Sequence, residues 1–233
     1  MTARSDLRRS ARRASRPALL GLLAIVASVG LVACAAPAAA LAPPEGDGPV
    51  VAFYGDSYTL GTGASDPALR WSTVISEERG WREYNPSVNG LGYINNRSTF
   101  GDGDLPDLII EQQPDIVFVT MGLNDNFSYD RVGERIQEQM NDDIDILVEA
   151  LPEARFIVVE PFWYTDERPE SVEVIIRWQR EMAERIDADY IEGASRWIEG
   201  RPELMASDGL HPDDDGYAVM TERMRAELEA LGL

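Results

Sequence analysis

Three side chains of this sequence have the types needed for nucleophilic catalysis at a carbonyl group: Ser57, Asp208 and His211. A serine hydroxyl is a weak nucleophile until a neighbouring base takes its proton. His211 is the only histidine of the chain, and Asp208 stands three residues before it, in a turn that holds a glycine and a proline. An Asp placed there can accept a hydrogen bond from the imidazole Nδ1 and leave Nε2 free as the base. The pattern predicts a Ser-His-Asp triad.

The tetrahedral intermediate of such a reaction needs hydrogen-bond donors, and losing one typically costs about 10²–10³ in rate. Three candidate donors are present: the backbone N–H of Ser57, the N–H of Gly90 and the side-chain amide of Asn124. A glycine at position 90 would let the backbone approach the reacting oxygen closely. Gly92 competes with Gly90 for this role, and the sequence leaves the choice open.

The elements that must position these residues alternate along the chain. Apolar runs predict strands at residues 50–54, 83–88, 116–121, 156–160 and 188–192. Helical spacing predicts helices at residues 67–79, 105–112, 131–151, 169–186 and 213–231. This alternation indicates one α/β domain with a parallel sheet covered on both faces. Ser57, Gly90 and Asn124 each follow a predicted strand, so we expect them at the carboxyl edge of the sheet, where such folds bind ligands.

Four short segments, in order along the chain, resemble the four sequence blocks of the SGNH/GDSL hydrolase family. They are Gly55-Asp56-Ser57, Gly90, Gly122-Leu123-Asn124-Asp125 and Asp208-Gly209-Leu210-His211-Pro212. The resemblance spans residues 50–231 and implies a flavodoxin-like three-layer α/β/α sandwich with about five parallel strands. The second block departs from the commoner form, because Asn89 precedes its glycine and Leu91-Gly92-Tyr93 follows it.

The same resemblance implies roles for individual residues. Ser57 would be the nucleophile, Asp208 and His211 would complete the triad, and Gly90 and Asn124 would join the Ser57 N–H in the oxyanion hole. The expected function is a serine esterase that works through an acyl-enzyme, without cofactor or metal, on short-chain or carbohydrate O-acyl esters. An acyltransferase acting on cell-envelope or extracellular sugars keeps the chemistry and changes the acceptor. A catalytically silent carbohydrate- or envelope-binding domain is a third interpretation.

Several aromatic residues lie close in sequence to the predicted strand ends. They are expected either to contact substrate or to pack beneath the loops, and the sequence does not separate the two. The candidate substrate-binding residues are Tyr58, Tyr93, Phe127, Trp163 and Tyr164, and Phe162 belongs to the same aromatic run. The predicted elements use nearly all of the chain, so no cap domain is expected over the site.

Residues 1–44 have the pattern of an export signal and linker, and residues 45–233 form the predicted hydrolase domain. Arginines precede an apolar run over residues 18–36, which is typical of a signal peptide. Cys34 ends a Leu-Val-Ala-Cys tetrad that resembles a bacterial lipobox, so we expect a lipidated, membrane-anchored lipoprotein on the outer face of the membrane. Cleavage after Ala40, giving a freely secreted protein, and an uncleaved anchor are the alternatives.

Charge limits the partners of this domain. The chain has 21 basic and 41 acidic residues, and residues 1–33 hold six arginines and one aspartate, which leaves 15 minus 40, or −25, for the remainder. Such a surface repels nucleic acid and anionic lipid, so membrane contact is expected only through the N-terminal lipid anchor. No lysine occurs, which excludes Schiff-base and P-loop lysines. A single cysteine allows no internal disulfide, and we expect a monomer whose partner is a small-molecule or carbohydrate ester.

Overall fold

The computed structural model describes residues 45–100 and 103–233, so the expected export signal and Cys34 lie outside the described residues. Five parallel strands form one sheet in the order β2-β1-β3-β4-β5. Their bounds are β1 (Val50–Tyr54), β2 (Arg82–Tyr84), β3 (Ile116–Val119), β4 (Arg155–Val159) and β5 (Asp189–Ile191). This order is that of flavodoxin-like folds, as expected. The order in which successive strands join the sheet reverses at β1, with β2 on one side and β3 on the other, and ligands of such folds bind at the carboxyl ends of β1 and β3.

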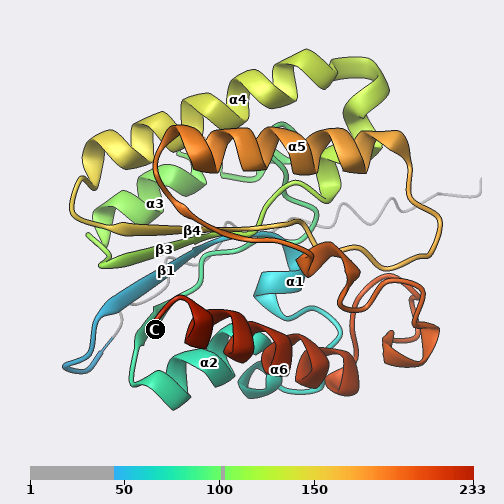
Figure 1. The fold of residues 1–233 in the computed structure, drawn as a ribbon, viewed down its shortest axis with the longest axis horizontal. Helices are drawn as coiled ribbons and strands as arrows, with labels where there is room; N and C mark the ends of the chain where they lie inside the picture. Colours follow the sequence, from blue (N-terminus) through green and yellow to red (C-terminus); the bar gives the residue numbers. More distant parts are fainter. Residues whose placement is uncertain (1–44, 101–102) are drawn as a thin grey trace, which may run out of the picture. The chain divides into compact units, whose positions relative to one another are not determined.

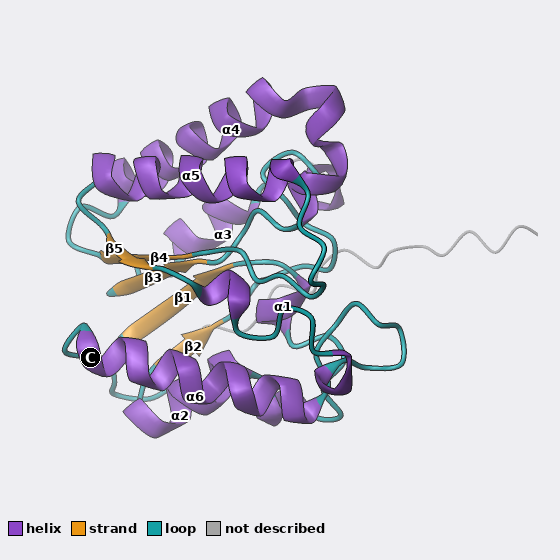
Figure 2. Ribbon diagram, turned by 45° about the vertical axis from the view of Figure 1, so that its right-hand side comes forward, coloured by secondary structure: helices purple, strands orange, loops and turns teal. Residues whose placement is uncertain are grey.

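Helices cover both faces of the sheet (Figures 1 and 2). On one face lie α2 (Trp71–Arg79) and α6 (Asp214–Ala230), and on the other lie α3 (Leu105–Glu111), α4 (Tyr129–Ala150) and α5 (Glu170–Arg185). A one-turn helix, α1 (Ser57–Leu60), stands at the carboxyl end of β1. Short 3₁₀ turns occupy Pro67–Leu69, Arg97–Phe100, Asn124–Ser128, Ala194–Arg196 and Pro202–Leu204. Among the residues described, no helix is both long and apolar enough to span a membrane.

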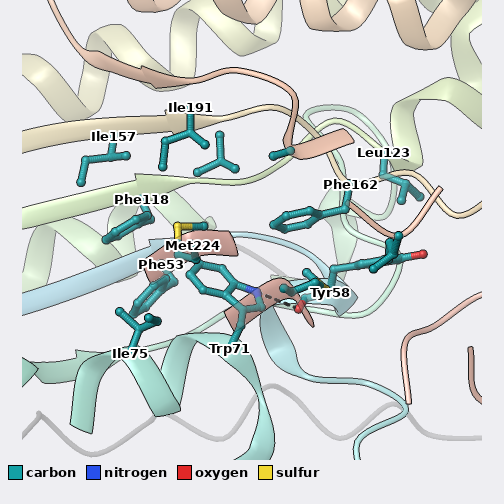
Figure 3. Packing of buried hydrophobic residues seen from close by; sticks show 14 of the residues in the cluster. Phe53, Tyr58, Trp71, Ile75, Phe118, Leu123, Ile157, Phe162, Ile191 and Met224 are labelled. Carbon is teal, nitrogen blue, oxygen red and sulfur yellow. Dashed lines mark hydrogen bonds between the residues drawn. The ribbon is translucent and has the colours of Figure 1, made fainter. Parts of the chain in front are cut away.

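Two hydrophobic cores result from the alternation of side chains along the buried strands. Val51 and Phe53 of β1 face α2 and α6, whereas Ala52 and Tyr54 face α3 and α4. Figure 3 shows the first core, in which the Phe53 ring stacks on Phe118 and meets Trp71 edge to face. Strands covered on both faces need apolar residues at every position, which explains why the strand runs of this sequence are continuous rather than alternating.

Local geometry moves some predicted boundaries. The expected helix 67–79 is broken at Arg70, whose backbone is extended, into a 3₁₀ turn and α2. The expected strand 83–88 ends at Tyr84, because Pro86 has no N–H for the ladder. The side chain of Asn85 instead donates to the carbonyl of Thr59, 2.7 Å away. The Ser87 hydroxyl donates to the Phe53 carbonyl of β1 at 3.4 Å, so the segment after β2 is held by both α1 and the sheet.

Gly55 lets the chain leave β1 at the point where α1 packs on the end of β3. A Cβ at this position would lie 2.5 Å from Thr120 Oγ1 and 2.6 Å from Thr59 Cβ. The hydroxyls of Thr59 and Thr120 are themselves hydrogen bonded at 2.6 Å. No side chain fits between them, so a glycine is required for α1 to begin directly beyond the strand.

Asp56 caps α1, its carboxylate accepting the N–H of Tyr58 at 3.0 Å. The side chain is almost completely buried. Burial, together with the smaller effect of the negative charge of Asp125, raises the pKa of this carboxyl group to about 7, and the hydrogen bond from the Tyr58 N–H opposes the rise. Between about pH 4 and pH 7, the folded protein therefore retains a proton on Asp56 that the unfolded chain has lost.

Substitution of Gly55 by alanine should destabilise the fold. Overpacking a closed site typically costs about 1–3 kcal/mol, and the clash here involves two side chains and little free space. Urea unfolding of Gly55→Ala measures the loss. Gly133→Ala is the matched control, because the added Cβ would stand in α4 at an ordinary 3.4 Å from Tyr129 and should stabilise the protein by about 0.5–1 kcal/mol. A Gly55→Ala protein with the wild-type midpoint would contradict this account of the strand end.

The buried Asp56 should make stability fall as pH rises. Its folded pKa lies above its unfolded value, so its unfavourable contribution is absent below about pH 4 and complete above about pH 7. Asp56→Asn keeps an acceptor for the capping bond without the charge. The free energy of unfolding of the variant, relative to wild type, should increase by up to about 4 kcal/mol across this range.

Denaturant unfolding at several pH values tests this prediction. Asp66→Asn controls for the loss of a capping carboxylate, because Asp66 caps the turn Pro67–Leu69 at an exposed position. A difference between Asp56→Asn and wild type that stays constant with pH would show that Asp56 does not titrate in the folded protein as described.

Candidate active site

Ser57 is the first residue of α1, at the carboxyl end of β1, the strand at which the strand order of the sheet reverses. Gly61, with φ of +91°, ends the helix after one turn, and its N–H donates to the Ser57 carbonyl at 3.0 Å. The first amides of a helix have no acceptor within it. No described residue accepts a hydrogen bond from the Ser57 N–H. The serine therefore offers both a hydroxyl and an available amide donor.

Asp208 and His211 are hydrogen bonded to each other within a single loop. One carboxylate oxygen of Asp208 accepts the backbone N–H groups of Leu210 and His211, at 2.9 and 3.0 Å. The other lies 2.7 Å from His211 Nδ1. These bonds, those with His211 first, lower the pKa of Asp208 to about 2, so the carboxylate is charged at any working pH. A charged acceptor at Nδ1 selects the tautomer in which Nε2 is free to accept a proton.

Asn124 joins the serine segment to the segment after β2. It opens the 3₁₀ turn that follows β3, and its side-chain amide donates to the Leu91 carbonyl at 2.9 Å. The same nitrogen lies 3.4 Å from a carboxylate oxygen of Asp56. The amide is thus held between the residue before Ser57 and the residue after Gly90.

The backbone geometry favours Gly90 over Gly92 as an amide donor. The N–H of Gly92 donates to the carbonyl of Asn95 at 3.0 Å and is occupied. The N–H of Gly90 has no acceptor within residues 45–100 and 103–233. Gly90 also adopts φ of +70°, a backbone conformation that favours glycine. Its carbonyl accepts hydrogen bonds from the side-chain amides of Asn95 and Asn96.

Asp125 holds the segment after β2 in place. Its carboxylate accepts the backbone N–H groups of Tyr93, Ile94 and Asn95, at 2.7, 3.0 and 3.4 Å. Burial raises the pKa of Asp125, and these amide bonds oppose the rise. A Cβ on Gly92 would lie 2.5 Å from this carboxylate. Gly92 is therefore needed for the contact with Asp125, a role that its position in the sequence did not reveal.

The structure links the segments that carry Ser57 and His211 through the neighbours of these two residues. The hydroxyl of Tyr58 donates to the carbonyl of Leu210 at 2.5 Å, so the residue after the serine contacts the residue before the histidine. In the described part of the chain, no hydrogen bond joins Ser57 Oγ to the imidazole. Nucleophile–base bonds are often long before substrate binds and tighten in the complex.

Three of the five aromatic residues expected to contact substrate are buried in the core. Tyr58 and Tyr93 have no exposed surface, and Trp163 is only 3% exposed. The structure does not support a substrate contact for them, because loops and the opposite core side chains cover their rings. Phe162 is buried in the same way. Tyr164 is partly exposed, and Phe127, three residues after Asn124, is 55% exposed.

A cavity of about 420 Å³ lies between the segment after β4 and the loop that carries Asp208. Tyr164 belongs to its lining, and its contact with substrate stays a prediction. Sequence reasoning missed the other residues of the lining, although Thr165, Ser207 and Gly209 directly flank predicted site residues. The complete lining is Tyr164, Thr165, Asp166, Gly200, Pro202, Met205, Ala206, Ser207 and Gly209.

Comparison with known proteins gives a consistent result. The profile of the GDSL-like lipase/acylhydrolase family matches residues 53–219. A GDSL lipase of Mycobacterium tuberculosis is 27% identical over 186 residues, which are 75% of this chain and 79% of that protein.

Solved structures share the fold at low sequence identity. The psychrotrophic esterase EstA from Pseudoalteromonas sp. has a TM-score of 0.61 and 16% identity, covering 78% of this chain and 97% of that one. A family two carbohydrate esterase from Clostridium thermocellum, solved with cellohexaose, has a TM-score of 0.64 and 14% identity, covering 82% of this chain and 67% of that one. The family profile covers well over half of the chain and includes all four site segments. The chain therefore belongs to the GDSL-like lipase/acylhydrolase family and is a carboxylic ester hydrolase.

Proposed function

We propose that the protein is a serine esterase that forms an acyl-enzyme on Ser57, with His211 as the base and Asp208 as the group that orients it. The observation that carries this proposal is the Asp208–His211 pair. Its 2.7 Å contact leaves Nε2 as the free acceptor, on a loop that is hydrogen bonded to the residue after Ser57. A general base of this kind is what a serine nucleophile requires.

The residues divide the reaction between them. His211 Nε2 takes the hydroxyl proton as Ser57 Oγ attacks the acyl carbonyl, and the carbonyl oxygen becomes an oxyanion. The imidazolium then gives its proton to the departing alcohol, which leaves the acyl group on Ser57. Water, deprotonated by the same imidazole, attacks the acyl carbonyl and releases the carboxylic acid, and the proton returns to Ser57. Asp208 stays charged throughout and stabilises the imidazolium.

The oxyanion would be held by three donors from three strand ends. They are the Ser57 N–H, the Gly90 N–H and the side-chain amide of Asn124. The first two have no acceptor among the described residues, and the Asn124 nitrogen has a second proton that makes only a long contact with Asp56. Such pre-positioned donors stabilise developing charge without reorganisation at the moment of reaction.

The substrates are proposed to be short-chain acyl esters of small alcohols or sugars. The cavity beside the Asp208 loop combines Tyr164, Met205 and Pro202 with the polar groups of Asp166 and Ser207. A lining of this kind suits an alcohol that carries hydroxyl groups more than a long alkyl chain. With most aromatic residues buried, little apolar surface remains to bind a long chain, and a buried CH₂ contributes only about 0.8 kcal/mol.

Two further parts of the proposal rest on the sequence. Export, with lipidation of Cys34 and attachment to the outer face of the membrane, is supported by the pattern of residues 1–44. Transfer of the acyl group to a sugar of the envelope or the exterior is the second candidate for the same chemistry. The polar groups of Asp166 and Ser207 in the cavity lining support a hydroxyl-bearing acceptor as an alternative to water.

A fluorophosphonate should inactivate the enzyme and label Ser57. Ser57→Ala should abolish labelling and lower kcat/KM for a model ester by at least about 10³-fold, because the nucleophile is lost. Peptide mass spectrometry and initial rates measure the two effects. Ser65→Ala is the control, since this serine is exposed and its hydroxyl contacts only Asp214, and it should keep its activity within twofold. Retained esterase activity in Ser57→Ala would exclude the acyl-enzyme mechanism.

Esters of increasing acyl length should show decreasing kcat/KM beyond about four carbons. The measurement uses C2, C4, C8 and C16 esters and acetylated sugars at fixed salt, with the acid and any new ester quantified. A maximum at C8 or longer would refute the short-chain proposal. With a sugar acceptor present, new ester in excess of free acid would assign the protein to the acyltransferases instead.

A further inference from the structure

The loop of residues 206–211 is hydrogen bonded mainly to itself. The N–H of Ala206 donates to the His211 carbonyl at 2.8 Å, and that of Gly209 donates to the Ala206 carbonyl at 2.9 Å. Asp208 accepts its three contacts from within the same loop. A bridge between Met205 and Pro212 closes its base. The acid and the base therefore form a unit whose internal geometry does not depend on the rest of the protein.

One hydrogen bond joins this loop to another part of the chain. The hydroxyl of Tyr58 donates to the Leu210 carbonyl, across 152 positions of sequence. In residues 45–100 and 103–233, no other hydrogen bond links residues 206–211 to residues outside them. Packing also confines the loop, because the backbone of Gly63 lies close to His211 and Pro212. Only the Tyr58 bond supplies a directed contact.

Tyr58 is itself held firmly. Its ring is fully buried and stacks on Phe162, with ring centroids 6.0 Å apart and planes inclined by 16°. Its carbonyl accepts the indole N–H of Trp71 at 3.1 Å, the dashed contact in Figure 3. Its backbone N–H is bonded to Asp56. Burial raises the pKa of the phenol well above its ordinary value, so the hydroxyl stays protonated and remains a donor.

We propose that Tyr58 is a positioning residue: its buried hydroxyl sets the distance between the His211 loop and Ser57. The proposal rests on the function proposed above. Tyr58 follows Ser57 directly in α1, so a single rigid residue fixes the nucleophile through the backbone and the base loop through its side chain. A shift of about 1 Å between reacting groups can cost on the order of 10²-fold in rate.

Tyr58→Phe tests the role of the hydroxyl while keeping the ring. The kcat for a short-chain ester should fall about 10-fold or more, with KM within twofold, and the rate of fluorophosphonate labelling should fall by the same factor. Tyr58→Leu, which removes the ring as well, should lower stability further and kcat by little more.

Tyr217→Phe is the matched control. Its hydroxyl is buried in the same core and donates to a backbone carbonyl, that of Thr62, at 2.8 Å. Its thermal stability should fall about as much as that of Tyr58→Phe, but its kcat should stay within twofold of wild type. Equal losses of kcat in the two variants would overturn the proposal.

A measurement on the wild-type protein keeps the proposal testable even where Tyr58→Phe is too unstable to assay. The Tyr58 hydroxyl proton should appear as a slowly exchanging NMR signal with a contact to residue 210, and its absence would overturn the proposal. Failure of the proposed function is distinguishable, because an active Ser57→Ala protein removes that function directly. A fully active Tyr58→Phe protein that is still labelled at Ser57 removes only the positioning role.

Discussion

The geometry of this site depends on the hydrogen bonds made by one buried carboxyl group, that of Asp56. It caps the helix that carries the proposed nucleophile and reaches the side-chain amide of Asn124 at the end of the neighbouring strand. Asn124 in turn holds the carbonyl of Leu91, and Asp125 holds the amides that follow. Two buried acids thus connect three strand ends, in addition to packing such as the edge-to-face contact between the rings of Tyr54 and Tyr93. Burying such groups costs free energy that the two cores must offset.

In this arrangement, one set of side chains stabilises the fold and another set orients the groups of the site. Apolar side chains fill both faces of the sheet and supply stability, whereas polar groups at the strand ends supply direction. A hydrogen bond fixes angle and distance, which dispersion contacts do not. The two acids therefore reduce stability locally and increase the precision with which the proposed oxyanion donors are placed. Functional sites commonly show this exchange of stability for geometry.

Much of the molecule was predictable from the sequence. The strand runs and helical spacings fixed the order of the elements, and the structure moves most boundaries by only one or two residues. Ser57, Asp208, His211 and Asn124 were predictable as candidates because each lies next to a distinctive local pattern. The short helix α1 was missed, although Asp56 before it and Gly61 after it are ordinary capping residues.

Other features could not be predicted because they depend on distant contacts. The choice between Gly90 and Gly92 depends on which amide the Asn95 carbonyl accepts, and local sequence does not show this. Tyr58 and Tyr164 are both tyrosines beside strand ends, yet one is buried and the other lines a cavity. Loop packing determines whether each ring is buried or exposed. The role of Tyr58 can therefore be inferred only once its hydrogen bond to Leu210, 152 positions away, is known.

The sheet has one further consequence, which concerns contacts between molecules. Its two edge strands, β2 and β5, are only three residues long and carry charged residues, Arg82 and Glu83 in one and Asp189 in the other. Short, charged edges offer few free backbone groups to a strand of another chain. These edges therefore give the protein a low tendency to form intermolecular β-structure. The charged edges thus oppose association between sheets, whereas the rigid polar cluster lies elsewhere, at the carboxyl ends of the strands.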